Sequence, residues 1–553
     1  MSILRDNVLN KDTAFTNEER EKYNIVARLP YRVETLDQQI ARCKQQYDKL
    51  STPIERWMYL TRLQEVNETL FCALAMKYIK EMLPVIYTPT VGTACKTYSD
   101  IWQMCPRGLF LNRNHKGRVA EILNQWPHEP KVIVATDGTR ILGLGDLGTG
   151  GHHITIGKLT LYTLGGGIDP KETLPISFDF GCNVDEIREN PNYLGLPEKR
   201  NKDQVYYDLI QETIDAVHNK WPNCVFQFED FSNDTAFKLL EMHRRRLGHP
   251  VFNDDIQGTG CIAAACVASA VKSCSLKMKK EVRARDQIYL LYGAGAGGIG
   301  VADNIANLSV AEGATIEQAR KQFYVVDSKG LLTTDRADYK NKTMAAHKLN
   351  YVRDDVSIEG NTTLMDVLKH FKPTCLLGLS TQFQAFNKEV IETMCSQIEQ
   401  PPIVLALSNP LTKCEATNQE VYDFSHGEAL YASGSPFKPM KTEDGEVETA
   451  QCNNFYVFPG IGLGCEICKP TEITDMMIAA VSKALADMMD EKELVKGTLL
   501  PPISEIREIS CHVAVGLIRQ AQKEGKATAK NLPANDKDLL ELCRKTQWQP
   551  KYE

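Results

Sequence analysis

The chain has 553 residues, of which 43% are hydrophobic and 24% are charged, and its formal net charge is −7. Because a single hydrophobic core stops growing at roughly 250 to 300 residues, this length predicts at least two domains. The small acidic excess leaves no cationic face suited to a polyanion, so we expect no nucleic-acid partner.

The first residues, MSILRDNVLNKDTAF, have neither the apolar core of a signal peptide nor the Arg-rich character of a transit peptide. The longest apolar stretch, Cys261 to Val271, is shorter than the roughly 18 residues that a membrane span requires. We therefore expect a cytoplasmic location, no transmembrane helix and no membrane partner. The 17 cysteines are scattered and often lie in apolar runs, a pattern typical of reduced, buried thiols.

The N-terminal part is predicted to be helical, because apolar residues recur at spacings of three and four in STPIERWMYLTRLQEVNETLFCALAMKYIKEML. We place a helical N-terminal domain at residues 1–105. Within it, Tyr87 lies in LPVIYTPTVG and is flanked by turn residues. An ordinary half-buried tyrosine is the alternative to a functional one at this position.

From Lys131 onward, strands and helices alternate, and we assign residues 106–253 and 454–525 to a central α/β domain. Apolar runs flank Asp137-Gly138 in KVIVATDGTRILGLGD, which predicts a β-hairpin. Further strands are expected in LPISFDFG and NCVFQFED. Lys158 is the last residue of the glycine-rich stretch GTGGHHITIGK, where a solvated lysine is the alternative to a catalytic one.

Two pairs of acids stand at predicted strand or loop ends, Glu229-Asp230 in FQFEDF and Asp254-Asp255 in FNDDIQGT. Carboxylates without basic neighbours are the oxygen ligands that Mg²⁺ or Mn²⁺ prefers. Because neighbouring side chains on extended backbone point to opposite faces, one acid of each pair could bind metal while the other acts elsewhere. Solvated acidic loops are the alternative interpretation.

The stretch from Gln287 to about Gly434 alternates regularly, which predicts a parallel, doubly wound sheet in a Rossmann-type dinucleotide-binding domain at residues 254–453. Its expected strands are QIYLLYG, QFYVVD, TCLLGLS, IVLALSNP and ALYASG. Residues 473 to about 526 are predicted to be helical, and residues 526–553 form a polar C-terminal extension. The C-x-x-C of Cys465 and Cys468 has no second pair, so core packing is a simpler interpretation than a metal or redox site.

Two stretches match G-x-G-x-x-G, namely ILGLGDLG at 141–148 and LYGAGAGGIG at 291–300. A dinucleotide site needs a strand before the loop, a helix after it and an acid at the end of the second strand. The second stretch meets these conditions, although its acid comes later than the usual ~20 residues because of an insertion around SVAEGATIEQARKQ. The glycines of the first stretch are better explained by close backbone approach or by a plain turn. The predicted dinucleotide contacts are Gly293, Gly295, Gly298 and Asp327.

These motifs, in this order, resemble the malic enzyme family over about residues 10 to 525. The matching fragments are LPVIYTPTVG, TDGTRILGLGDLG, IGKLTLY, FQFEDF, FNDDIQGT, GAGAGGIG, VVDSKGLL, ALSNP, YASGSPF and NNFYVFPG. The resemblance implies divalent-metal-dependent oxidative decarboxylation of L-malate to pyruvate and carbon dioxide, with reduction of a nicotinamide dinucleotide. It implies a homo-oligomer, either a dimer or a tetramer. It also implies that the first glycine loop lines the active cleft and the second binds the dinucleotide.

The resemblance further implies roles for individual residues. Tyr87 looks like the general acid, Lys158 like the general base, and Asp254 like a carboxylate that orients the lysine. The implied metal ligands are Glu229, Asp230 and Asp255. Two of them are adjacent, which alternation of side chains on extended backbone does not predict. The implied substrate and cofactor contacts are Arg140, Asn409, Asn453 and Asn454.

The choice between NADP and NAD rests on the acid at the end of the second strand. Asp327 suits the 2′-hydroxyl of NAD, because a carboxylate would repel a phosphate. However, the DSKG that contains it resembles the NADP-using branch of the family. Ser328, Lys329, Lys340 and Lys342 could supply a hydroxyl and positive charge to a 2′-phosphate. We therefore expect NADP as the cofactor, with NAD as the alternative.

Two departures from the family pattern concern regulation. Relatives usually read GMGIPVGK where this chain has GHHITIGK, which places His152 and His153 near the predicted base and could alter the pH dependence. A Glu-Arg-Asn stretch that helps bind fumarate in activated relatives reads EVN here with Val66, although Arg42 matches another arginine of that site. Fumarate activation is therefore not carried over to this chain.

Two other functions stay open on the residues alone. A metal-independent amino-acid dehydrogenase also combines a lysine domain with a later Rossmann domain, but it would not need Glu229, Asp230 and Asp255 together. A catalytically dead nucleotide sensor would be expected to have lost Tyr87, Lys158 or the acids, and all of these are present.

Overall fold

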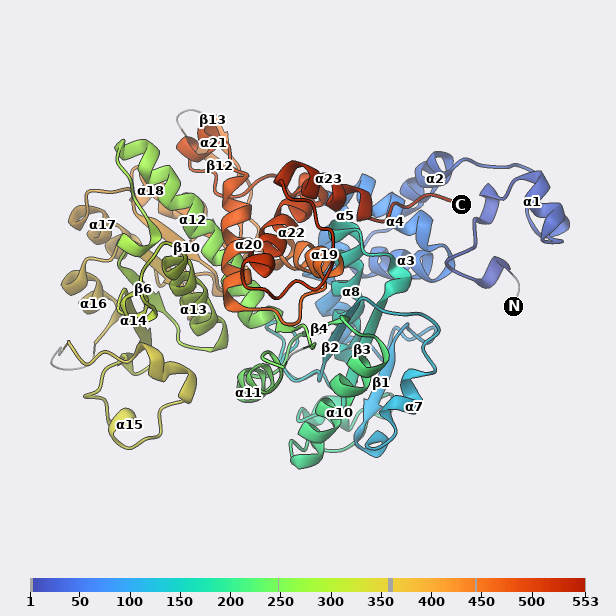
Figure 1. Ribbon diagram of the computed structural model, residues 1–553, viewed down its shortest axis with the longest axis horizontal. Coiled ribbons are helices and arrows are strands. Elements are labelled where there is room, and N and C mark those ends of the chain that lie inside the picture. The colour runs from blue at the N-terminus through green and yellow to red at the C-terminus, as the bar shows by residue number, and fades with distance from the viewer. Residues whose placement is uncertain (1–2, 247, 357–361, 443–444, 553) are drawn as a thin grey trace. The chain divides into compact units, whose positions relative to one another are not determined.

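The computed structural model describes residues 3–246, 248–356, 362–442 and 445–552 (Figure 1). It divides into two compact units, Met1–Phe231 with Arg544–Glu553, and Ser232–Cys543. These units do not coincide with the four predicted domains, which span five ranges. One reason is that the helices after residue 454 pack on α12 (Thr259–Met278) and α13 (Ala296–Ala311) of the second unit.

The first unit begins with helices, which confirms the helical N-terminal prediction. Thr16, Thr35 and Thr52 cap the first three of them, each accepting a hydrogen bond from the amide three residues later and so satisfying a free N–H group. The helices before the first strand are α1 (Asn17–Lys22), α2 (Leu36–Asp48), α3 (Pro53–Val66), α4 (Glu68–Lys77), α5 (Ile79–Ile86) and α6 (Thr90–Lys96).

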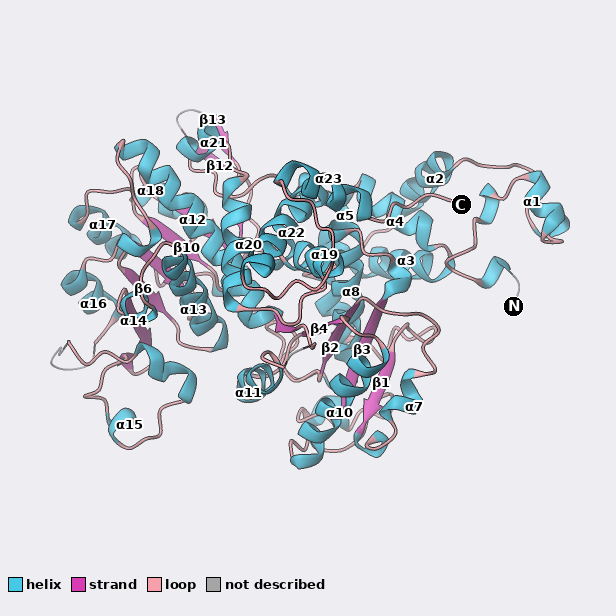
Figure 2. Cartoon of the chain, in the orientation of Figure 1, coloured by secondary structure: helices cyan, strands magenta, loops and turns pink. Residues whose placement is uncertain are grey.

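Parallel strands follow in the first unit (Figure 2). Strand β3 (Thr173–Asp179) pairs with β1 (Leu109–Asn112) and β2 (Val132–Thr136), and β2 also pairs with β4 (Val225–Phe228). Every residue of β2 and β4 is buried, as expected for parallel strands covered on both faces. The helices of this part are α7 (Val119–Leu123), α8 (His152–Leu161), α9 (Asp185–Arg188) and α10 (Gln204–Lys220).

The hairpin predicted at Asp137-Gly138 is wrong. Strand β2 ends at Thr136 and pairs in parallel with β3 and β4, and the chain then turns through an isolated bridge between Ile141 and Gly145. Gly138 has a φ of +73°, and a Cβ there would lie 2.0 Å from the carbonyl oxygen of Gly148. The loop therefore folds closely on itself. No hairpin forms, because the buried β2 takes its partners from later, parallel strands.

The second unit contains the predicted doubly wound sheet, in the strand order β14-β11-β10-β9-β6-β7-β8. All neighbouring strands pair in parallel except β7 and β8, which are antiparallel at the edge. The strands are β6 (Tyr289–Tyr292), β7 (Phe323–Asp327), β8 (Gly330–Leu331), β9 (Cys375–Gly378), β10 (Ile403–Ala406), β11 (Leu430–Ser433) and β14 (Ala450–Gln451).

Helices cover both faces of this sheet. Leu290, Leu376 and Val404 share one apolar cluster with α16 (Leu364–Phe371), α17 (Lys388–Gln397) and α18 (Asn418–Phe424). Helix α13 contacts β6, and α12 contacts β10. The remaining elements of this unit are α11 (Asn233–His243), β5 (Val251–Asn253), α14 (Ile316–Arg320), α15 (Ala337–Lys340), β12 (Met440–Thr442) and β13 (Gly445–Val447).

The long helix that leads into the sheet is a core helix. The helical segment Asp254–Met278 is long and apolar enough to cross a membrane by length and composition alone. However, 78% of its most apolar 18-residue stretch is buried inside the protein. Helix α12 packs against α20 (Asp475–Asp487), which in turn packs on α22 (Ile506–Lys523). The other helices near the C-terminus are α19 (Phe458–Cys468), α21 (Glu491–Lys496) and α23 (Asp536–Thr546).

Candidate active site

Three predicted site residues meet in the first unit. Tyr87 directly follows α5, Lys158 lies on α8, and Glu229 directly follows β4. The Lys158 Nζ lies 2.9 Å from Glu229 Oε1 and 5.1 Å from the centre of the Tyr87 ring. The Tyr87 hydroxyl donates to the same Oε1 atom at 3.2 Å. All three side chains are buried, so the structure joins the two predicted proton-handling groups to a predicted metal ligand.

The close approach of α8 to Tyr87 depends on Gly157. A Cβ at this position would lie 3.1 Å from Tyr87 Cδ2 and 3.4 Å from the carbonyl oxygen of Ile86. Because contacts this short require the neighbour to shift, a side chain at residue 157 would displace the Tyr87 ring from its present position.

Tyr87 is held in its protonated form. Burial raises its pKa well above the ordinary value, and the nearby charge of Lys158 only partly offsets this. The phenol is therefore a proton donor across the neutral pH range. An amine and a phenol beside one carboxylate can together take up and release protons during a reaction.

Glu229 is oriented by two residues that the sequence reasoning did not identify. The side chain of Gln227 donates to Glu229 Oε2 at 2.6 Å, and the hydroxyl of Tyr162 donates to Gln227 Oε1 at 2.5 Å. Gln227 is fully buried on β4. A polar residue inside the buried strand FQFED is the signal that could have found it, because buried amides need hydrogen-bond partners.

Asp230 leaves the extended conformation directly after β4, with a φ of +56°. Its carbonyl oxygen accepts from the amide of Arg140 at 3.1 Å, and its Oδ2 accepts from the amide of Leu142 at 3.0 Å. Side chains of neighbouring residues alternate between faces only on extended backbone, so this alternation does not apply to Glu229 and Asp230. The residue Arg140 is exposed in the loop that Asp230 holds.

The two histidines of GHHITIGK are buried on α8. The His152 Nε2 lies 2.8 Å from the carbonyl oxygen of Arg107, and the His153 ring packs at 4.7 Å against Trp57. Burial lowers the pKa of His152 to about 4 and that of His153 to about 3. Both rings are therefore neutral near pH 7, and their titration is not expected to shape a pH profile there.

The second acid pair begins a helix in the second unit. Residues Asp254–Gly258 form a π-helical turn that continues into α12. Asn454 donates from Nδ2 to Asp254 Oδ2 at 2.7 Å and to the Asp254 carbonyl oxygen at 3.1 Å. Asp254 is buried and Asp255 is half-buried. The structure thus joins Asp254 to Asn454, which lies in the other predicted domain range.

The second glycine loop has the geometry that a dinucleotide requires. Gly293 follows β6 with a φ of +116°, and a Cβ there would lie 2.3 Å from the carbonyl oxygen of Leu379. A Cβ at Gly298 would lie 2.0 Å from the carbonyl oxygen of Gly293, so α13 can pack closely on the loop. At Gly295, directly before α13, a Cβ would lie no closer than 3.9 Å to its nearest neighbour, the side-chain nitrogen of Asn233. The loop is therefore open where a pyrophosphate would approach the helix N-terminus.

Asp327, at the end of β7, is surrounded by cations. Its carboxylate accepts from Arg336 Nη1 at 2.8 Å and from Lys348 Nζ at 2.7 Å. Burial alone would raise the pKa of Asp327, but the hydrogen bonds from Arg336 and Lys348 outweigh it and hold the pKa below its ordinary value. Neither Arg336 nor Lys348 was predicted, because each lies beyond β8 and only the fold returns it to Asp327.

The other predicted dinucleotide contacts also lie in the second unit. Ser328, Lys329, Lys340 and Lys342 are exposed. Asn409 is exposed after β10 and accepts from the hydroxyl of Ser435 at 2.6 Å. The remaining contact, Asn453, follows β14 and accepts from the amide of Phe455 at 2.9 Å. Because β6, β7, β10 and β14 run parallel, the glycine loop shares the carboxyl edge of the sheet with Ser328, Lys329, Asn409 and Asn453.

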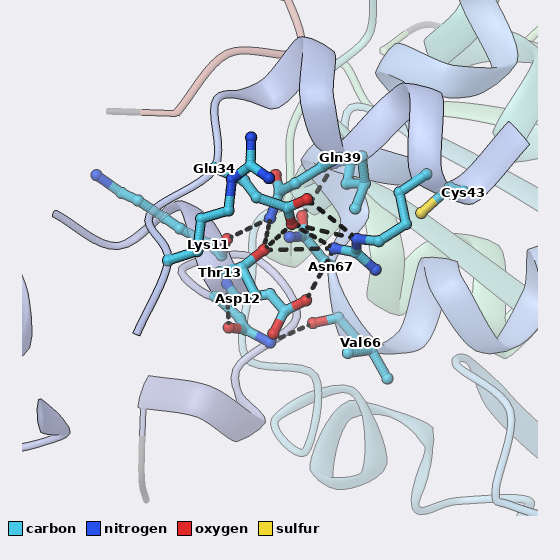
Figure 3. A network of polar contacts seen from close by, with 12 residues as sticks. Lys11, Asp12, Thr13, Glu34, Gln39, Cys43, Val66 and Asn67 are labelled. Carbon is cyan, nitrogen blue, oxygen red and sulfur yellow. Dashed lines mark hydrogen bonds and ion pairs between the residues drawn. The ribbon is translucent and has the colours of Figure 1, made fainter. Parts of the chain in front are cut away.

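Arg42 lies in a polar network near the N-terminus, part of which is labelled in Figure 3. Its Nη2 donates to Glu34 Oε2 at 2.8 Å, and the hydroxyl of Thr13 donates to the same oxygen at 2.5 Å. The hydrogen bond from Arg42, and to a smaller extent that from Thr13, holds the pKa of Glu34 below its usual value. On the other side, Gln39 links Thr13 to Tyr552 near the C-terminus. A carboxylate of this chain thus already compensates Arg42, and an external dicarboxylate would have to compete with Glu34.

Comparison with known proteins gives consistent results for both parts of the chain. The family model "Malic enzyme, N-terminal domain" matches residues 64–244, and the model "Malic enzyme, NAD binding domain" matches residues 256–522. The NADP-dependent malic enzyme of Dictyostelium discoideum is 41% identical over 552 residues, which cover 100% of this chain and 98% of that protein. The NAD-dependent malic enzyme of Shewanella denitrificans is 39% identical over 553 residues, which cover 100% and 96%. In fold, the chain is similar to the crystal structure of Entamoeba histolytica malic enzyme, with a TM-score of 0.58, 23% identity and coverage of 94% and 90%.

Proposed function

The chain belongs to the malic enzyme family, and from this premise we propose that it oxidises and decarboxylates L-malate to pyruvate and carbon dioxide with reduction of NADP. The observation that carries the proposal is the buried cluster of Tyr87, Lys158 and Glu229. It supplies one base, one acid and one carboxylate within hydrogen-bond reach, which is what successive deprotonation and reprotonation of a substrate needs.

Lys158 acts as the general base that takes the proton of the malate hydroxyl. Tyr87 acts as the general acid that protonates the enol at carbon, and its raised pKa keeps the proton in place until that step. Their shared neighbour Glu229 holds both groups in one position. When bound, the nicotinamide accepts the hydride, and a divalent cation stabilises the negative charge that develops on the carbonyl oxygen during decarboxylation. Asp254, oriented by Asn454, is proposed to support the lysine.

We assign Mg²⁺ or Mn²⁺ to Glu229, Asp230 and Asp255. Glu229 and Asp230 are adjacent buried carboxylates, and oxygen donors of this kind fit a hard cation. The left-handed backbone at Asp230 removes the reason for its side chain to point away from that of Glu229. Arg140, Asn409 and Asn454 are proposed to contact the substrate carboxylates and the cofactor.

The preference for NADP is supported by the charges around Asp327. Three cations, Lys329, Arg336 and Lys348, pair with two carboxylates, Asp327 and Asp338, so this group of side chains carries one net positive charge. The carboxylate that would repel a 2′-phosphate is thus compensated before the cofactor binds. Arginine and lysine at such a position are suited to bind a phosphate.

The reaction is tested by following malate-dependent reduction of NADP and of NAD, with and without Mn²⁺, and by identifying pyruvate as the product. We expect turnover only with the metal. Activity with amino acids instead of malate would favour the amino-acid dehydrogenase, and dinucleotide binding without turnover would favour the inactive sensor.

Lys158→Ala should abolish malate oxidation but impair decarboxylation of added oxaloacetate less, because the base is needed first for the hydroxyl proton.

The cofactor choice is tested by the ratio of kcat/KM for NADP to kcat/KM for NAD. Lys348→Gln is expected to lower this ratio about tenfold, because a cation beside the phosphate is lost, and added salt should lower it in the wild type. Lys342→Gln is measured beside it as a comparison, since Lys342 is also a predicted phosphate contact but is exposed and, among the described residues, does not pair with Asp327, and the smaller effect is expected there. A larger effect at Lys342, or a wild-type preference for NAD, would contradict the assignment.

We further propose that the protein is a homo-oligomer, a dimer or a tetramer, and that it acts in the cytoplasm on malate as a small-molecule substrate. Analytical ultracentrifugation of the purified chain tests the first point. Imaging of a fluorescently tagged chain in its own cells tests the second. A monomer or an organellar signal, respectively, would contradict these proposals.

A further inference from the structure

Two cysteines of the second unit face each other. The Sγ atoms of Cys266, on α12, and Cys452, directly after β14, lie 3.4 Å apart. Both are free thiols in the structure. A disulfide needs a separation of about 2.0 Å, so a small side-chain rotation at one or both residues would allow the bond.

One member of this pair is accessible to a reagent in solution. Of the 17 cysteines, 14 are buried, Cys105 is exposed, and Cys395 and Cys452 are half-buried. Cys266, by contrast, is fully buried. The pair therefore combines a thiol that solvent can reach with a second thiol that can resolve a bond formed on the first, an arrangement typical of redox-responsive cysteines.

The position of the pair in the fold gives the bond a structural consequence. Helix α12 leads the chain into the seven-stranded sheet, and Cys452 lies where the chain leaves it. Asn454, two residues later, already contacts Asp254 at the start of the α12 segment. A bond between Cys266 and Cys452 would fasten the same two segments at a second point.

We propose that Cys266 and Cys452 form a redox-responsive dithiol site that reacts with small disulfides such as oxidised glutathione. The Cys452 thiolate attacks one sulfur of the glutathione disulfide, forming a mixed disulfide and releasing one glutathione thiolate. The Cys266 sulfur, after losing its proton, attacks Cys452 Sγ and displaces the second glutathione. Two cysteine thiols are thereby oxidised to one disulfide, and the two protons end on two molecules of reduced glutathione.

The second step is expected to be the slower one. The contact with Cys452, together with burial, raises the pKa of the Cys266 thiol well above its ordinary value. Because the thiolate is the attacking species, ring closure should accelerate as the pH rises from 7 to 8.5.

The test uses the reduced full chain incubated with oxidised glutathione under native conditions, followed by alkylation of free thiols and peptide mapping by mass spectrometry. The expected result is a linked pair of peptides containing Cys266 and Cys452, which dithiothreitol separates. Cys105 should carry glutathione and so confirm that the reagent was active. Cys465 and Cys468 are fully buried on α19 and should remain alkylatable only after denaturation.

Two variants keep the inference falsifiable. Cys266→Ala should trap glutathione on Cys452, because the resolving thiol is gone, and Cys452→Ser should leave Cys266 reduced. Circular dichroism checks that each variant is folded, and either one alone suffices for the comparison. The inference is overturned if the mixed disulfide on wild-type Cys452 persists at pH 8.5 without giving a bond to Cys266, or if both cysteines stay reduced while Cys105 is modified.

Discussion

Gln227→Met tests whether the buried amide of Gln227 orients Glu229. The substitution keeps a side chain of similar length on β4 but removes the hydrogen bond to Glu229 Oε2 at 2.6 Å and that from Tyr162 at 2.5 Å. Without these bonds, Glu229 keeps its contacts with Lys158 and Tyr87 but is held less firmly in its present orientation. The variant is therefore expected to lose both stability and metal-dependent activity.

The size of the stability loss follows from the two bonds. A hydrogen bond to a charged acceptor contributes about 1.5 to 3 kcal/mol, and a neutral one contributes about 0.5 to 1.5 kcal/mol. The free energy of unfolding should thus fall by about 2 to 4.5 kcal/mol. Residues that orient a metal ligand typically change metal affinity by about 10- to 100-fold, so the Mn²⁺ concentration for half-activity should rise by at least about tenfold.

The measurements are urea unfolding of the wild type and variant, and initial rates of malate oxidation over a series of Mn²⁺ concentrations. Tyr162→Phe is the matched control, since it removes the outer bond and leaves the bond to Glu229. It should cost about 1 kcal/mol and change the Mn²⁺ dependence little. Wild-type stability and wild-type Mn²⁺ dependence in Gln227→Met would show that the amide has no part in holding Glu229.

Three further predictions concern the loop, the helix α8 and acid stability. Gly298→Ala should lower the thermal midpoint by several degrees, because its Cβ would meet the loop carbonyl at 2.0 Å. Gly295→Ala, with 3.9 Å of clearance, should leave the midpoint unchanged while raising the KM for the dinucleotide, and equal effects would contradict the assigned roles. Gly157→Ala should reduce kcat about tenfold, since its Cβ would lie 3.1 Å from the Tyr87 ring, and unchanged steady-state turnover would count against this. His152 has a folded pKa of about 4 against an unfolded value of 6.5, so its contribution to stability, about 3 kcal/mol, is present above pH 6.5 and lost as the pH falls toward 4. Urea unfolding at pH 7 and pH 4.5 should show a smaller loss in His152→Gln than in the wild type.

Local pattern in the sequence was enough to predict the second glycine loop, the strands beside it and the position of Asp327. A strand, a turn that needs glycine and a helix start are each encoded by residues within a few positions of one another. The predicted hairpin at Asp137-Gly138 shows the limit of the same reasoning. That turn signal is real, but the partners of β2 come from distant parallel strands, and a local pattern contains no information about them.

Motifs and periodicity along the chain were sufficient to predict the family, the helical beginning, the doubly wound sheet and the residue types of the candidate site. Only the tertiary structure showed that Tyr87 and Glu229, 142 residues apart, share a hydrogen bond, that Gln227 orients Glu229, and that Lys348 compensates Asp327. These contacts depend on how side chains from separate elements meet in space. Hydrogen bonding and ion pairing act over a few ångströms, whatever the separation along the chain.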